Sequence, residues 1–184
     1  EILPHLLKSK RAYDCEYSLF NYFQAIVYRL KTGCQWRQLP LKEFFENDQP
    51  VWQSVYYHYH KWCKDSCFKT IWQEFSLKLK DNFDLSLINL DGSHTPAKRG
   101  GDQVEYQTRK KCKTTNMLFL TDKKGNFLAC SDPISGNHHD SYNLVDNFKI
   151  MKKFTLLKRS ETLVMNADSG FDVKSFVHCC FENN

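Results

Sequence analysis

Leu85-Ser-Leu-Ile-Asn-Leu-Asp91-Gly-Ser-His94 is the stretch that decides the fold of the second half of the chain. Its apolar residues predict a β-strand that ends at the carboxylate of Asp91. The pattern returns seventy-seven residues later as Thr162-Leu-Val-Met-Asn-Ala-Asp168-Ser-Gly-Phe-Asp172. Two strands that each end in Asp would place two carboxylates side by side at one end of a sheet. A magnesium-dependent nuclease requires that arrangement.

The segments between these two strands predict how the sheet is connected. Residues 114–121 and 125–131 form a hairpin, and a helix should run from His139 or Asp140 to about Met151. With a last helix from about Asp172, the order is strand, strand, strand, helix, strand, helix. This order predicts an α+β fold in which three strands form a meander and the fourth joins the open edge of the first through a helical crossover. Asp91 and Asp168 would then lie on neighbouring parallel strands.

Each acid also has a purely structural interpretation. Asp91-Gly92 is a common hairpin turn, and Asp168-Ser-Gly170 can be a strand-to-helix turn in which Asp172 is the helix cap. Asp140, at the end of Gly136-Asn-His-His-Asp140, is another candidate acid, although capping of the following helix is its simpler use. The pairing favours a functional role for Asp91 and Asp168, because two neighbouring carboxylates repel each other unless a cation lies between them.

Composition limits the class of protein without deciding it. The 184 residues are 41% hydrophobic and 15% aromatic, enough for one good core or two small ones. The net charge of +5 permits a polyanionic partner without requiring one. No signal peptide and no apolar run of about 18 residues is found, so we expect a cytoplasmic protein, not a membrane protein, whose eight cysteines are reduced.

Basic residues gather between the two acids. A solvated strand edge is their usual use, and contact with DNA phosphates is the second interpretation. These residues are Arg109, Lys110, Lys111 and Lys113.

The first half of the chain, residues 1–84, has the periodicity of helices with one buried face. Helices are predicted from Asp14 to Leu30 with a stop at Gly33, from about Asp48 or Pro50, and from about Ser66 to Lys80. In the last of these, Phe75 and Leu79 should face inward together with Phe68, Ile71 and Trp72. Three short helices predict a DNA-binding module of the helix-turn-helix type, and a plain supporting bundle is an equal alternative. We place the domain boundary between residues 84 and 85, and assign residues 85–184 to the second domain.

The second predicted helix carries residues suited to contact with DNA: Tyr56, His60, Lys61 and Lys64. Cys63 and Cys67, with His58 and His60 nearby, also invite a zinc interpretation. We disfavour zinc because a second pair of ligands at the usual spacing is missing and buried thiols are common in protein cores.

Several separated motifs resemble one family. Thr32-Gly-Cys-Gln-Trp36-Arg-Gln-Leu-Pro40, Val51-Trp-Gln-Ser-Val-Tyr56 and Tyr59-His-Lys-Trp62 are similar to the N-terminal domain of bacterial insertion-sequence transposases of the insertion-sequence-five group. Leu90-Asp91-Gly-Ser-His94, Gly136-Asn-His-His-Asp140 and Ala167-Asp168-Ser-Gly-Phe-Asp172 resemble the catalytic half of the same enzymes, in the same order.

The resemblance implies an RNase H-like catalytic domain with a DDE triad, two Asp and one Glu, that holds two divalent metal ions. By this match Asp91 is the first acid and Asp168 the second, while His94 and Asp140 are accessory residues. The implied cofactor is magnesium, with manganese as a substitute. The implied activity is cleavage and strand transfer of DNA by a nucleoid-associated protein. Its partners would be terminal inverted repeats and target DNA, and the full-length protein would be a homodimer.

One departure from the family pattern affects the expected activity. The third acid should lie on a later helix, and Glu182 is the only Glu after Asp168. Because Glu182 falls at the far end of the helix that leads away from the site, we expect a truncated, catalytically incomplete chain. The alternative from another class is a non-catalytic DNA-binding regulator, or a degenerate remnant, derived from a transposase gene.

Overall fold

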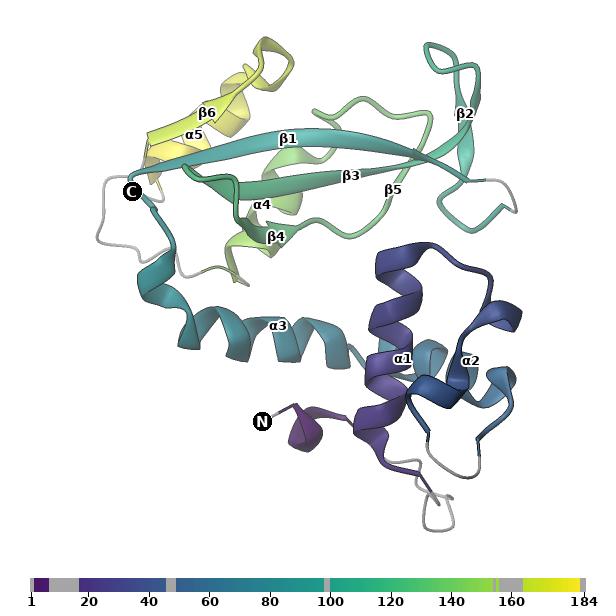
Figure 1. Ribbon diagram of the computed structural model, residues 1–184. Helices are drawn as coiled ribbons and strands as arrows, with labels where there is room; N and C mark the ends of the chain where they lie inside the picture. Colours follow the sequence, from purple (N-terminus) through teal and green to yellow (C-terminus); the bar gives the residue numbers. More distant parts are fainter. Residues whose placement is uncertain are drawn as a thin grey trace. The chain divides into compact units, whose positions relative to one another are not determined.

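The computed structural model describes residues 2–6, 17–45, 49–97, 100–153, 155 and 164–182 (Figure 1). The chain forms two compact units, Glu1–Glu74 and Phe75–Asn184, which are described separately below. The boundary between residues 84 and 85 stays a prediction. No helix in these described ranges has the length and apolar character that crossing a membrane would need.

The first unit is helical. Its α-helices are α1 (Leu19–Thr32), α2 (Trp52–Lys64) and the start of α3 (Cys67–Lys78), with short 3-10 turns at Leu3–His5, Trp36–Gln38 and Leu41–Glu43. Ser18 caps α1 by accepting a hydrogen bond from the Phe20 N–H, so the helix begins at Leu19. The predicted start at Asp14 lies outside the described residues. The predicted stop is confirmed, because Gly33 follows α1 in the left-handed conformation with φ of 69°.

An aromatic core holds the helical unit together. Trp62 is fully buried, and Phe45 packs edge-on against the ring of Tyr22. The prediction that Phe75 and Leu79 face inward is wrong, because these side chains are 47% and 36% exposed. Cys67, Phe68 and Ile71 of α3 pack in the helical core.

The second unit is built on a mixed sheet. Its strands are β1 (Leu87–Pro96), β2 (Glu105–Gln107), β3 (Cys112–Asp122), β4 (Phe127–Cys130), β5 (Ile134–Ser135) and β6 (Val164–Ala167). The order is β2-β3-β1-β6, with β4 and β5 also paired to β3. β1 is antiparallel to β3 and parallel to β6, which confirms the predicted meander and crossover. Figure 1 shows β1 and β3 as the long central strands, with β6 at one end and β2 at the other.

The core of this unit lies on one face of the sheet. Along β3, inward residues from Thr114 to Asp122 are buried while the residues between them are half-buried. Leu118 and Leu120 pack with Phe148 and Met151 of α4 (Leu144–Lys153), and Phe176 of α5 (Lys174–Glu182) completes the cluster. The opposite face of β1 and β3 is therefore the more exposed face.

Two sequence-based predictions in this unit are wrong. β1 does not end or turn at Asp91: its pairing with β3 continues from Asp91↔Phe119 to Pro96↔Thr114, so the strand passes through Asp91-Gly92. Asp140 does not cap the next helix, because α4 begins only at Leu144 and the Asp140 carboxylate accepts a hydrogen bond from Asn116.

Candidate active site

The parallel pairing of β1 with β6 sets the position of the two predicted acids. Its register is Leu87↔Val164, Ile88↔Met165, Asn89↔Asn166 and Leu90↔Ala167. The next residue of each chain segment is Asp91 or Asp168, so the two residues lie at one level of neighbouring strands. The predicted neighbourhood is thus confirmed, although Asp91 lies inside its strand and only Asp168 follows a strand end.

Both acids belong to the more exposed face of the sheet. Asn166 Nδ2 donates a hydrogen bond of 3.2 Å to Asn89 Oδ1, so these side chains share a face. Asp91 lies two residues after Asn89 and has the same orientation, because alternate residues of a strand share a face. Asp168 continues from β6 in an extended conformation and follows Asn166 in the same way. The buried Ile88 and Leu90 face the other side.

Each acid is held by a backbone N–H. Asp91 Oδ1 accepts from the Gly92 N–H at 2.8 Å, and Asp168 Oδ1 accepts from the Gly170 N–H at 2.8 Å. Asp168 is the N-cap of the 3-10 turn Ser169–Phe171, and Asp172 is the residue that follows this turn. Both carboxylates are exposed at the surface. An apolar hollow lined by Phe171, Phe176 and Phe181 adjoins Asp168.

Two neighbouring carboxylates suit a hard divalent cation, because magnesium and manganese prefer oxygen ligands. The described residues contain no group of three His, Cys, Asp or Glu side chains that could hold a metal ion. The donor set is therefore the pair Asp91 and Asp168. Glu182, the only later Glu, is exposed at the end of α5 and pairs with His178 at 3.1 Å.

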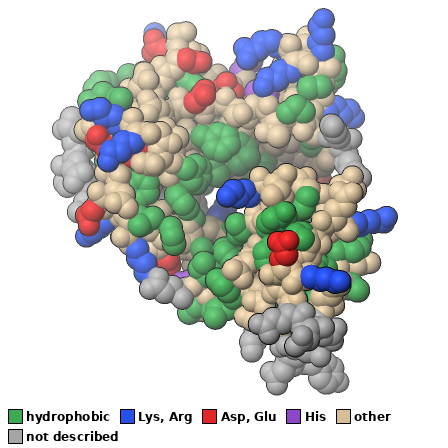
Figure 2. Space-filling model, viewed as in Figure 1, with side chains coloured by type: hydrophobic (Ala, Val, Ile, Leu, Met, Phe, Trp, Pro, Cys, Tyr) green, Lys and Arg blue, Asp and Glu red, His purple; other side chains and the backbone are tan. Residues whose placement is uncertain are grey.

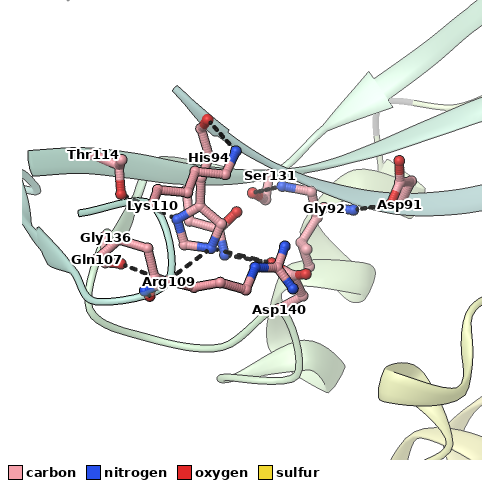
Figure 3. A network of polar contacts seen from close by, with 12 residues as sticks. Asp91, Gly92, His94, Gln107, Arg109, Lys110, Thr114, Ser131, Gly136 and Asp140 are labelled. Atoms are coloured by element: carbon pink, nitrogen blue, oxygen red, sulfur yellow. Dashed lines mark hydrogen bonds and ion pairs between the residues drawn. The ribbon is translucent and has the colours of Figure 1, made fainter. Parts of the chain in front are cut away.

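Asp140 is not brought to this pair. A Cβ placed on Gly92 would overlap the Asp140 carboxylate, so Asp140 lies against β1 at Gly92. Gly92 faces the same side as Leu90, opposite to Asp91. Figure 3 shows Asp91 and Asp140 on opposite sides of the strand. Asp140 is thus separated from the acid pair by β1 itself.

His94, the other accessory residue, joins a polar network at the far end of β1 (Figure 3). His94 Nδ1 lies 3.1 Å from Thr114 Oγ1, and its Nε2 lies 3.4 Å from Gln107 Nε2 and 3.7 Å from Asp140 Oδ1. Burial lowers the pKa of His94, and the charge of Asp140 opposes this shift. A neutral imidazole with its proton on Nδ1 can donate to Thr114 and accept from Gln107.

The basic residues lie in a hairpin between β2 and β3. The side chains of Arg109, Lys110, Lys111 and Lys113 are all exposed. Lys111 has φ of 52° at the tight turn, and Lys110 Nζ donates to the His94 carbonyl at 3.0 Å. Figure 2 shows Lys and Arg side chains gathered at the β2 end of the unit. The hairpin therefore presents a cluster of positive charge.

In the helical unit, α2 carries its predicted DNA-contacting residues on or near the surface. Tyr56 is 43% exposed and packs edge-on against Trp36, and His60 and Lys64 are exposed. Lys61 is half-buried and forms an ion pair with Asp65 one turn later. Three of the four side chains are thus exposed, and the fourth is engaged with a carboxylate.

The zinc interpretation finds no support in the described residues. Cys67 is buried in the helical core while Cys63 is exposed, so the two thiols face different surroundings. Among the residues that the structure describes, no set of three metal-ligating side chains includes them.

Sequence reasoning missed the polar residues that surround the acids and the hairpin. They are Asn89, Gln107, Thr114, Asn116 and Asn166. A signal was present: Thr114 and Asn116 occupy inward positions of an alternating strand, and a buried polar group must find a hydrogen-bond partner. The partners themselves come from distant segments, so the sequence pattern alone does not identify them.

Residues 90–184, just over half of the chain, match the family described as DDE superfamily endonuclease. The chain belongs to the DDE endonuclease superfamily. Residues 1–72 match a second family, described as "Putative transposase of IS4/5 family (DUF4096)". The mixed sheet and the DDE superfamily membership together confirm the predicted RNase H-like fold, and the DDE part of the predicted resemblance is confirmed.

Other comparisons add little to the DDE superfamily assignment. A search of curated proteins found no match. Among solved structures, the chain is similar to the one titled "Mos1 transposase paired-end complex with left transposon end", with 11% sequence identity and a TM-score of 0.38. The match covers 96% of this chain and 60% of that chain, so our chain spans less than two thirds of that transposase.

Proposed function

We propose that the chain acts in DNA transposition: it binds transposon-end DNA and brings Asp91 and Asp168 to a site for metal-dependent phosphodiester cleavage and strand transfer. The observation that carries this proposal is the β1–β6 register, which puts the two acids at one level and on one exposed face. The membership of the chain in the DDE superfamily supports the proposed function. The resemblance to this family implies that Asp91 and Asp168 are the first two acids of the DDE triad.

Asp91 and Asp168 would hold magnesium, or manganese in its place, through their carboxylate oxygens. When bound, such ions activate the attacking oxygen and stabilise the leaving oxygen of an in-line displacement at phosphorus. The role of the protein is to hold the carboxylates of Asp91 and Asp168 together at a surface that a DNA backbone can reach. The Gly92 and Gly170 N–H groups assist by orienting one oxygen of each acid.

We further propose that this chain alone neither cleaves nor joins DNA. Two carboxylates make a weak metal site, since magnesium catalysis in such nucleases uses more protein ligands than the described residues bring together here. Magnesium-dependent cleavage of transposon-end DNA by the purified chain, abolished by Asp91→Ala, would contradict this part of the proposal.

Metal binding tests the acid pair directly. Isothermal titration of the purified chain with Mn²⁺ should show one weak site, with a dissociation constant on the order of 1 mM. Asp91→Asn and Asp168→Asn should each remove this binding. Asp140→Asn is the matched control, because Asp140 lies on the opposite side of β1 and keeps its hydrogen bond from Asn116 as an amide. Equal loss in all three variants would refute the assignment of the pair.

DNA binding tests the basic hairpin and α2. We propose that Arg109, Lys110, Lys111 and Lys113, with Tyr56, His60, Lys61 and Lys64, contact phosphates. Binding of a labelled 30-base-pair duplex, followed by fluorescence anisotropy, should weaken steeply with salt. Lys64→Gln should reduce the slope of log K against log salt by about 0.9, the value for one lost phosphate contact. A chain that binds no duplex at low salt would overturn the proposed DNA partner.

A further inference from the structure

The loop of residues 136–142 is pressed onto the sheet at two glycines. A Cβ on Gly136 would overlap the carbonyl oxygen of Thr114 on β3, and a Cβ on Gly92 would overlap Asp140. These close approaches leave no room for a side chain at either position. The loop therefore lies directly on β1 and β3. Any side chain at Gly92 or Gly136 would push the loop away from the sheet.

Side-chain hydrogen bonds secure the same loop. Asn116 Nδ2 donates to Asp140 Oδ1 at 2.7 Å, and Gln107 Nε2 donates to the Gly136 carbonyl at 3.2 Å. At the end of the loop, Asn147 Nδ2 donates to the Tyr142 carbonyl at 3.2 Å, which ties it to α4. The loop is thus attached to β2, β3 and α4, and it presents its remaining side chains from a fixed backbone.

The side chains that this loop displays are aromatic and basic. The rings of His138 and Tyr142 stack with centroids 3.6 Å apart and planes 6° apart. Tyr142 is 43% exposed and His139 is exposed, so neither is used mainly for packing the core. The exposed ring of Tyr142, stacked on the half-buried ring of His138, offers a flat surface on which another planar group can stack.

The basic hairpin approaches this loop closely. Gln107 bridges the hairpin to Gly136, and Lys110 Nζ reaches the His94 carbonyl (Figure 3). Burial is the main cause that lowers the pKa of His94, and the neighbouring Lys110 and Arg109 lower it further. Asp140, the acid in this group, is engaged by Asn116. Positive charge and an aromatic surface therefore lie together.

We propose that the basic turn of residues 107–111 and the loop 136–142 form one binding surface for unpaired DNA, with an exposed base stacking on Tyr142 and with Arg109, Lys110 and His139 contacting the flanking phosphates. The inference rests on the proposed function. It gives the loop a role in DNA binding that is separate from the role of Asp91 and Asp168. Single-stranded DNA fits because its bases are free to stack, whereas paired bases in a duplex are already stacked on each other.

The test compares single-stranded and duplex DNA on the full chain. A labelled 12-nucleotide oligothymidine and a duplex of equal length are titrated at fixed salt. Tyr142→Ala should weaken binding of the single strand about tenfold, the loss of one base–aromatic stack, and should change duplex binding less than about twofold. Tyr142→Phe should retain single-strand binding because the ring is kept.

Tyr106→Ala is the matched control. Tyr106 is 52% exposed and belongs to the same hairpin, but it alternates with Gln107 and so faces away from the loop. Its substitution should leave single-strand affinity within about twofold of the original. Equal losses for Tyr106→Ala and Tyr142→Ala, or a Tyr142→Ala loss that is the same for duplex and single strand, would overturn the inference.

The phosphate contacts have a separate readout. Lys110→Gln should lower the salt slope for the single strand by about 0.7, the value for one phosphate contact. An unchanged slope would mean that Lys110 makes no phosphate contact, and would contradict the proposal. If the unsubstituted chain binds duplex DNA but not the oligothymidine, this inference fails while the proposed function stands. If it binds no DNA, both fail.

Discussion

Asp122 and Asp91 belong to paired strands of one sheet, but their carboxylates are used in opposite ways. Asp122 is fully buried and accepts hydrogen bonds from the Asp84 N–H at 2.9 Å, the Asn126 N–H at 2.7 Å and Asn126 Nδ2 at 3.0 Å. Asp91 is exposed and accepts one from Gly92. The same residue type thus serves the β3–β4 turn at one position and is presented to solvent at the other.

The difference separates structural acids from candidate functional acids. Asp122 connects the chain before β1 to the β3–β4 turn, so its hydrogen bonds stabilise the fold. Asp91 and Asp168 are placed at one level of adjacent strands, where their like charges repel. Two like charges on neighbouring strands oppose folding unless a cation binds to their oxygens. The following predictions test whether Asp122 serves the fold and whether Asp91 serves a binding site.

The largest effect is expected at Asp122. Asp122→Ala leaves the Asp84 and Asn126 N–H groups without their acceptor, and should lower the free energy of unfolding by about 3 kcal/mol at pH 7. Urea denaturation of the purified chain measures this loss. Asp91→Ala is the comparison, and it should stay within about 0.5 kcal/mol of the original. Equal losses at the two positions would end the distinction between them.

A smaller loss is expected when the covered face of the sheet is crowded. Gly136→Ala should cost about 2 kcal/mol, because the new Cβ meets the Thr114 carbonyl, a backbone group that cannot rotate away. Gly170→Ala is the control beside Asp168, where the nearest atom to a Cβ would be Asp168 Oδ1 at 3.0 Å. Its cost should be below about 1 kcal/mol, since a side chain on the exposed face can move. The reverse order in thermal unfolding would contradict this account of the loop.

The sequence predicts the acid pair better than its surroundings for a physical reason. The apolar runs before Asp91 and Asp168 are local signals, and the rules for crossover connections bring the two strands together. Asp91-Gly92 resembles a turn because turn propensity is local too, yet pairing with β3, about thirty residues later, carries the strand through it. The predicted start of the following helix fails in the same way, because Asp140 bonds to Asn116 instead of capping.

The network at His94 was beyond prediction for another reason. Gln107, Thr114 and Asp140 are separated in sequence and meet only because two glycines admit the loop. Periodicity predicts three helices in the first half of the chain, but it does not show which residues of α3 are buried, since Phe75 has the spacing of an inward residue and is 47% exposed. Apolar spacing identifies one side of a helix, but only the packed structure shows whether other residues bury that side.

Acid should reduce the contribution of Asp122. Burial by itself would raise the pKa of Asp122, but the hydrogen bonds from Asp84 and Asn126 outweigh it and the pKa is lowered from 3.8. A lowered pKa means that the stabilisation is complete above the unfolded-state value and is lost as pH falls through the folded-state value. The difference in unfolding free energy between the original chain and Asp122→Asn should therefore be constant from about pH 7 to 5 and shrink below about pH 4. A difference that is unchanged at about pH 3 would contradict this explanation.

The smallest effect is expected at the acid pair itself. Without metal, Asp91→Asn should raise the free energy of unfolding by a few tenths of a kcal/mol, because it removes one of two like charges from neighbouring strands while the amide oxygen still accepts from Gly92. Millimolar Mg²⁺ should raise the melting temperature of the original chain, since a ligand that binds only the folded state stabilises it. It should leave Asp91→Asn unchanged. Melting curves with and without Mg²⁺ measure both effects, and a variant that is destabilised without metal would mean that Asp91 serves the fold as Asp122 does.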